Sequence, residues 1–130
     1  MINHLGFTVS DLRRSRAFYV QALAPLGFGV VVDVTREQTG SYDGSGFGPP
    51  GRAQFWIGTG DRHSGPVHVA FEATSRTAVD AFYDAAIAAG GLDNGAPGLR
   101  PHYHEHYYGA FVLDPDGHNI EAVCHAPQAG

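Results

Sequence analysis

The chain has 130 residues, of which 43% are hydrophobic, and this is the size and composition of one domain that can form a core without disulfides or a structural metal. Its net charge of -5, with no cluster of basic residues, argues against nucleic acid or an anionic membrane as a partner. The single cysteine excludes an intrachain disulfide, the first residues lack a signal-peptide pattern, and no long apolar run is present, so we expect a cytoplasmic protein.

An internal repeat organises the sequence. Shifting the chain by 64 residues aligns residues 4–28 with residues 68–92 without a gap. Eight positions are then identical, where chance would give about two, so the chain is expected to contain two copies of one unit. We predict a single domain over residues 1–130, built from repeats 1–60 and 65–125. The identical pairs are His4/His68, Phe7/Phe71, Ala17/Ala81, Phe18/Phe82, Tyr19/Tyr83, Ala22/Ala86, Ala24/Ala88 and Gly27/Gly91.

Each repeat is expected to begin with a strand. Residues 2–9 and 67–73 alternate, so that their large apolar side chains share one face of each strand. His4 and His68 fall on the opposite face. The two histidines therefore occupy equivalent positions that do not belong to the core.

A helix is predicted after each of these strands. Ser10 or Asp11 can cap the first helix, whose apolar residues recur at helical spacing, and Ser75 can cap the second. Gly27 and Gly90 are suitable residues at which to end the two helices.

Three short strands are expected to follow each helix, which gives an α+β fold of two βαβββ modules. A turn that contains proline and glycine precedes the last strand of each module, at residues 49–51 and 115–117. The predicted strands cover residues 29–35, 40–47 and 52–57 in the first module, and 99–103, 108–114 and 118–124 in the second.

A metal site is predicted where the two repeats meet. His4 and His68 can converge if the modules pack around a pseudo-twofold axis, and Glu121 lies on the last strand, on the face opposite its apolar neighbours. Two imidazoles and one carboxylate form a facial triad that leaves coordination positions open on a divalent ion. The alternative is that these residues form the polar lining of a metal-free cleft.

Residues 100–108 form a segment rich in histidine and tyrosine. Tyr103, Tyr107 and Tyr108 are candidates for binding substrate or donating a proton, while the alternative is a solvated connection between strands. The three alternating histidines of this segment could also bind a metal adventitiously.

Several stretches resemble the vicinal oxygen chelate superfamily, which includes glyoxalases, bleomycin-resistance proteins and extradiol dioxygenases. Residues 3–12 (NHLGFTVSDL) and 15–19 (SRAFY) look like its first module, and residues 67–71 (VHVAF) and 114–121 (DPDGHNIE) look like its second. The resemblance implies a glyoxalase-like fold, in which paired modules form an open, cup-shaped mixed sheet that is often completed in a homodimer.

The same resemblance implies a divalent metal ion, such as Zn, Fe, Mn or Ni, whose ligands match His4, His68 and Glu121. It implies catalysis on a small substrate that chelates the ion through adjacent oxygens, with lyase, isomerase, transferase or dioxygenase chemistry. The alternative, from a different class, is a metal-free protein that sequesters a small molecule, as bleomycin-resistance proteins do.

One departure from the glyoxalase I pattern affects the expected reaction. Those enzymes typically have a fourth protein ligand on the last strand of the first module. Aligning Gly51 with Gly117 places Phe55 opposite Glu121, and Gln54 is then expected to face the other way. A three-ligand site resembles the fosfomycin-modifying and extradiol-dioxygenase branches more closely than glyoxalase I.

Overall fold

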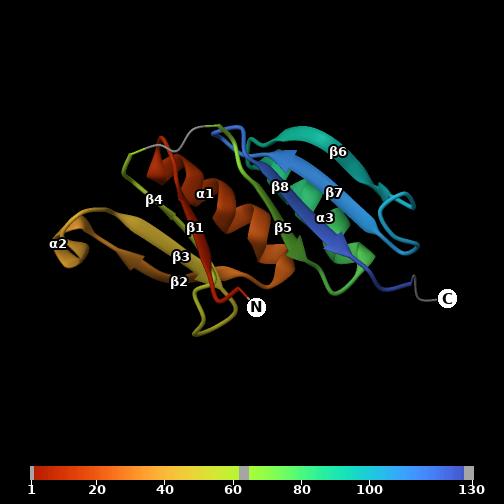
Figure 1. The fold of residues 1–130 in the computed structure, drawn as a ribbon, viewed down its shortest axis with the longest axis horizontal. Helices are drawn as coiled ribbons and strands as arrows, with labels where there is room; N and C mark the ends of the chain where they lie inside the picture. The colour runs from red at the N-terminus through yellow and green to blue at the C-terminus, as the bar shows by residue number, and fades with distance from the viewer. Residues whose placement is uncertain (1, 62–64, 128–130) are drawn as a thin grey trace.

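The chain forms two four-stranded mixed sheets, each with its own long helix (Figure 1). A computed structural model describes residues 2–61 and 65–127. The strand orders are β1-β4-β3-β2 and β5-β8-β7-β6, so each module has the same topology and the predicted α+β class is confirmed. The first module contains β1 (Leu5–Thr8), α1 (Leu12–Leu23), the short 3-10 helix η1 (Ala24–Leu26), β2 (Gly29–Val34), α2 (Arg36–Thr39), β3 (Gly44–Gly48) and β4 (Phe55–Gly58). The second contains β5 (His68–Glu72), α3 (Arg76–Ala88), β6 (Leu92–Leu99), β7 (Tyr108–Leu113) and β8 (Asn119–Cys124).

The two long helices begin and end as the sequence predicts. The Asp11 carboxylate accepts a hydrogen bond from the Arg14 backbone N–H at 3.1 Å, and the Ser75 hydroxyl oxygen accepts one from the Ala78 N–H at 3.1 Å. Gly27 and Gly90 follow the helical segments with φ values of 79° and 99°, a region that favours glycine.

Both long helices cover one side of the sheets and leave the other side open. Figure 1 shows the sheets next to each other, with α1 and α3 behind them. On β5, Val69 and Phe71 are buried while His68 and Ala70 are exposed, as expected for a strand with one face on the core. The Phe55 and Phe71 rings lie 5.2 Å apart, edge to face, and join the two modules in one core. No helix within the described ranges is long and apolar enough to cross a bilayer.

Two predicted strands differ most from the structure, while those predicted at residues 2–9 and 52–57 are shorter, at residues 5–8 and 55–58. The strand expected at residues 99–103 lies instead at residues 92–99, because β6 accommodates its glycines and proline through two irregularities in its pairing with β7. In the first module, residues 36–39 form the short helix α2, which Gly40 ends at φ 85°, so the strand predicted from residue 40 begins only at residue 44.

A buried hydrogen-bond network joins the turn before β8 to the first module. The Tyr19 hydroxyl donates to Asp114 Oδ2 at 2.6 Å, and Asp114 Oδ1 accepts from the backbone N–H groups of Asp116 and His118 at 2.9 and 2.8 Å. Burial, together with the Asp114 charge, raises the pKa of Tyr19 well above its usual value, so the phenol remains a donor. The Asp-Pro-Asp-Gly segment therefore has a structural role between modules.

Replacing Tyr19 with phenylalanine should lower the free energy of unfolding by about 1.5–3 kcal/mol, because Asp114 stays buried after losing a charge-assisted hydrogen bond. Chemical denaturation of the parent and the variant measures this difference. Tyr83→Phe, at the equivalent position of the second repeat, is the matched control and should cause a smaller loss, because Tyr83 is only partly buried. Equal losses for the two variants would contradict the structural role of the Tyr19 contact.

Candidate functional site

His68 and Glu121 meet on the open side of the second sheet. They lie on the parallel strands β5 and β8, where Ala70 pairs with Glu121 and His68 pairs with Asn119. The distance from His68 Nε2 to Glu121 Oε1 is 2.9 Å. The His68 side chain is 53% exposed, whereas that of Glu121 is only 2% exposed. The pair therefore combines a nearly buried carboxylate with an imidazole that faces solvent. These two predicted ligands are brought together.

Tyr107 contacts the other carboxylate oxygen of the pair. Its hydroxyl donates a hydrogen bond to Glu121 Oε2. Burial, followed by the contact with Glu121, raises the pKa of Tyr107 far above that of a free tyrosine, so this phenol keeps its proton at neutral pH and acts as a hydrogen-bond donor. A side chain at Gly109 would place a Cβ only 3.1 Å from the Tyr107 ring, so glycine provides the space for this contact.

The other two candidate tyrosines do not contact Glu121. Tyr103 is 61% exposed, and its ring packs edge-on against that of Tyr107 at 5.1 Å. Tyr108 donates to Asp80 Oδ1 at 2.6 Å, and its ring lies beside the guanidinium of Arg76. Tyr103 therefore borders the site, whereas Tyr108 belongs to the contact between β7 and α3.

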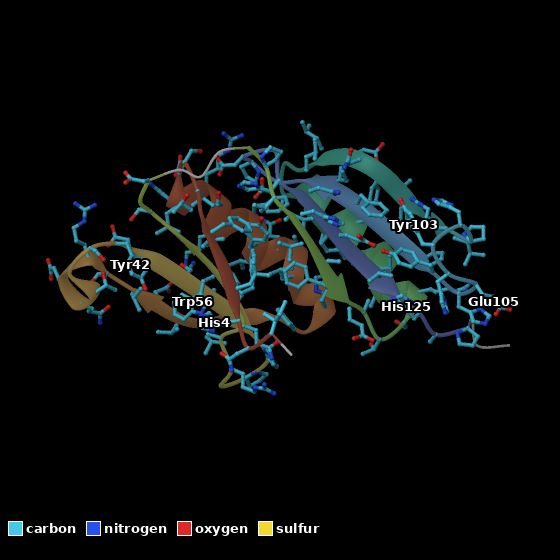
Figure 2. The ribbon with its side chains drawn as sticks, in the orientation of Figure 1. His4, Tyr42, Trp56, Tyr103, Glu105 and His125 are labelled. Carbon is cyan, nitrogen blue, oxygen red and sulfur yellow. The ribbon has the colours of Figure 1, made fainter. Side chains whose placement is uncertain are left out.

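His4 lies in a separate cleft on the first module. The cleft has a volume of about 660 Å³, and its lining includes His4, Tyr42 and Trp56 but neither His68 nor Glu121. Figure 2 shows these three residues on the first module, while Tyr103 and His125 lie on the second. Among the residues that the structure describes, no group of three or more His, Cys, Asp or Glu side chains could hold a metal. A single chain therefore does not bring His4 to the pair formed by His68 and Glu121.

Trp56, and not Phe55, is the first-module counterpart of Glu121. Gly6 on β1 and Ala70 on β5 are equivalent positions, because they are 64 residues apart, as the two repeats are. Gly6 pairs with Trp56, and Ala70 pairs with Glu121 in the same parallel arrangement. The alignment based on the turn glycines was wrong by one residue, because the first module has an extra residue between its turn and β4. Phe55 is instead a core residue that is 1% exposed. Neither aromatic side chain can coordinate a metal, so this position supplies no fourth ligand.

A histidine cluster near Tyr107 was only partly expected from the sequence. The His104 ring lies 6.4 Å from that of His106 and 5.5 Å from that of His125. The His125 ring also packs edge-on against Tyr107 at 5.2 Å. His125 directly follows β8 and reaches the loop before β7, and no local sequence signal indicates this contact.

Comparison with known proteins adds family information to this geometry. Residues 1–122 match the model of the Glyoxalase/Bleomycin resistance protein/Dioxygenase superfamily. No curated protein matches the chain. A crystal structure of a glyoxalase/bleomycin resistance protein from Albidiferax ferrireducens T118 is 31% identical, with a TM-score of 0.75, and the match covers 96% of this chain and 98% of that one.

Two more distant structures share the fold. A glyoxylase/bleomycin resistance protein/dioxygenase domain from Frankia sp. EAN1pec is 18% identical, with a TM-score of 0.71 over 95% of this chain and 96% of that chain. A mutant of glyoxalase I from Zea mays is 21% identical, with a TM-score of 0.69 over 94% of this chain and 46% of the maize chain. The match to the family model over residues 1–122 shows that this chain belongs to the glyoxalase/bleomycin resistance protein/dioxygenase superfamily, also known as the vicinal oxygen chelate superfamily.

Proposed function

We propose that this protein is a metal-dependent enzyme that acts on a small molecule with adjacent oxygen atoms. The observation that carries the proposal is the contact between His68 and Glu121, in which a nearly buried carboxylate lies 2.9 Å from an exposed imidazole. Burying a carboxylate costs free energy unless a hydrogen-bond donor or a cation compensates its charge. The Tyr107 hydroxyl donates to Oε2, and a divalent ion held by both side chains would compensate the charge at Oε1.

The two side chains have suitable chemistry and spacing for such an ion. Imidazole nitrogen and carboxylate oxygen bind zinc and similar ions at about 2.0–2.2 Å, so two ligand atoms on one ion lie at most about 4.4 Å apart. The 2.9 Å separation falls within that limit. In one chain, however, these two residues are the only members of the predicted triad that lie together, and two protein ligands are fewer than such sites usually have.

We propose that His4 of a second copy completes the triad in a homodimer. Each module has an open sheet face, and the face of the first module carries His4 while that of the second carries His68. A twofold axis that sets the first module of one copy against the second module of the other would produce two equivalent sites. This arrangement retains the proposed ligands His4, His68 and Glu121 and explains why one chain does not assemble them.

The side chains of this protein would have separate tasks. A bound dication supplies Lewis acidity to the adjacent oxygens of a substrate. Glu121 offsets part of that positive charge, and His68 forms the solvent-facing side of the site. Tyr107 would orient the Glu121 carboxylate through the hydrogen bond that its hydroxyl donates to Oε2. Tyr103 packs on Tyr107 and would help to hold that ring in place.

The second candidate function is metal-free binding of a small molecule. The separate cleft at His4, about 660 Å³ in volume, has the size of a ligand site and can exist without a metal. In that case His68 and Glu121 would form only a local hydrogen bond.

A metal titration of untagged, chelator-treated protein tests the leading proposal against this alternative. His104, His106 and His125 are first replaced by asparagine to remove binding by the exposed histidine cluster. Calorimetry with Mn(II), Zn(II) or Ni(II) should then give one ion per chain. His68→Ala should weaken binding by at least about 100-fold, more than the loss of an outer hydrogen-bond partner causes.

The matched control for this titration is His102→Ala, which removes an exposed histidine that packs on Tyr103 outside the proposed triad. It should leave the affinity unchanged. No stoichiometric binding to the parent protein, or equal affinities for the parent and His68→Ala, would reject the metal-dependent function.

A further inference from the structure

The floor of the cleft at His4 is built around an aromatic residue with glycine on both sides. Trp56 on β4 pairs with Gly6 on β1 and with Gly46 on β3. A Cβ at Gly46 would lie 2.9 Å from Cζ2 and 3.0 Å from Cε2 of the Trp56 indole, so the ring lies directly over the Gly46 backbone. The missing side chain is what allows the indole to lie along the sheet.

A second ring repeats this arrangement at the other end of the same floor. Gly44 pairs with Gly58, and a Cβ at Gly44 would lie 3.2 Å from Cε2 of Tyr42. A Cβ at Gly58 would lie 3.4 Å from Cδ2 of the same ring. The Trp56 ring therefore lies over Gly46, and the Tyr42 ring lies over Gly44 and Gly58. Figure 2 shows Tyr42 and Trp56 on the same module as His4. We call Trp56 and Tyr42, with these glycines, the aromatic platform.

The polar groups of the cleft are few, and two are already satisfied by the backbone. The Thr8 hydroxyl donates to the Asp61 carbonyl at 3.1 Å, and the Thr59 hydroxyl oxygen accepts from the Asp43 N–H at 3.0 Å. Among the described residues that line the cleft there is no Asp, Glu, Lys or Arg. His4 Nδ1 lies 2.8 Å from the Asn3 side-chain oxygen. The other ring nitrogen, Nε2, does not take part in this contact.

We propose that the cleft binds its ligand through a planar, uncharged aromatic or heteroaromatic ring stacked on the aromatic platform. Aromatic rings prefer stacked or edge-to-face contacts, and both platform residues offer ring surface next to an uncharged lining. Oxygen substituents on the bound ring would point toward His4. As a statement about the substrate class, the inference rests on the proposed function. Binding of the aromatic ring to the platform, however, requires no metal.

A matched pair of probes tests the platform in the presence of EDTA, so that the outcome is independent of the metal site. We choose 2-naphthol and its saturated counterpart decahydro-2-naphthol, which differ in planarity while keeping the hydroxyl. Trp56 is the only tryptophan in the chain, so its indole N–H gives a single signal in a ¹⁵N-labelled protein. Titration with 2-naphthol should shift this signal, and calorimetry should show binding about threefold to tenfold tighter than for the saturated probe.

Two variants show whether the platform causes this preference. Gly46→Ala introduces a Cβ that displaces the indole, and Trp56→Leu keeps an apolar side chain but removes the ring; each should abolish the preference for 2-naphthol. Gly29→Ala is the control, because a Cβ there meets no atom within 4 Å. Equal affinities for the two probes in the parent protein, or an unchanged preference in both platform variants, would overturn the inference whatever the metal titration gives.

Discussion

Replacing Glu121 with glutamine is expected to eliminate stoichiometric metal binding while the fold remains intact. Glutamine has the same size, but it lacks the negative charge that offsets the dication and can offer it only an amide oxygen. The affinity should fall by more than about 100-fold, because even the loss of an outer partner of a ligand costs about 10- to 100-fold. The side chain is 2% exposed and its two oxygens contact His68 and Tyr107, so the variant also weakens these contacts, and its free energy of unfolding without metal should be slightly lower.

The measurement is a calorimetric titration of the protein that lacks the exposed histidine cluster. Glu72→Gln is the matched control, because Glu72 lies on the same strand as His68 but is exposed and outside the proposed triad. That control should bind metal like the parent, and circular dichroism should show the same fold for all three proteins. Identical affinities for the parent and Glu121→Gln would reject the triad.

Much of the fold could be predicted because the repeat supplies long-range information that local patterns lack. The alternation of Val69 and Phe71 with His68 predicts which face of β5 is buried, and the structure confirms it. β6 was misplaced because its Asn, Gly and Pro residues are typical of turns, although an edge strand tolerates them. The repeat itself would have corrected this error, since residue 28, just before β2, aligns with Leu92.

The assignment of Phe55 shows how sensitive a site prediction is to strand register. Side chains alternate between faces, so an error of one residue exchanges a core position for a position on the open face. The number of residues between a turn glycine and its strand differs between the modules, and the sequence gives no direct sign of this. Pairing of Gly6 with Trp56 settles the register.

The position of His4 illustrates a different limit of sequence reasoning. Parity correctly placed His68 and Glu121 on one face, because both belong to neighbouring strands of one sheet. His4 belongs to the other sheet, so whether it joins them depends on how two sheets meet, either within one chain or between two copies. The residue pattern along the chain is the same in both cases and cannot distinguish them.

Mixing two variants that each lack stoichiometric metal binding should therefore restore part of that binding if the site is shared between copies. A mixed dimer contains one His4→Ala chain and one Glu121→Gln chain. One of its two sites would combine His4 of the Glu121→Gln chain with His68 and Glu121 of the His4→Ala chain, and would be intact. Random exchange of equal amounts should place half of the chains in mixed dimers, each with one intact site out of two, and should restore about one quarter of the parent's metal sites. Neither variant alone should bind stoichiometrically.

The control mixes His68→Ala with Glu121→Gln, because both substitutions damage the same half of the proposed site. No dimer in that mixture would contain an intact triad, so metal binding should not return. Native mass spectrometry verifies that mixed dimers form in both experiments. Mixed dimers that bind no metal in the first experiment would reject the shared site, as would equal recovery in the two. Recovery in the first experiment alone would locate His4 opposite His68 and Glu121 across the dimer, since no arrangement within one chain can produce it.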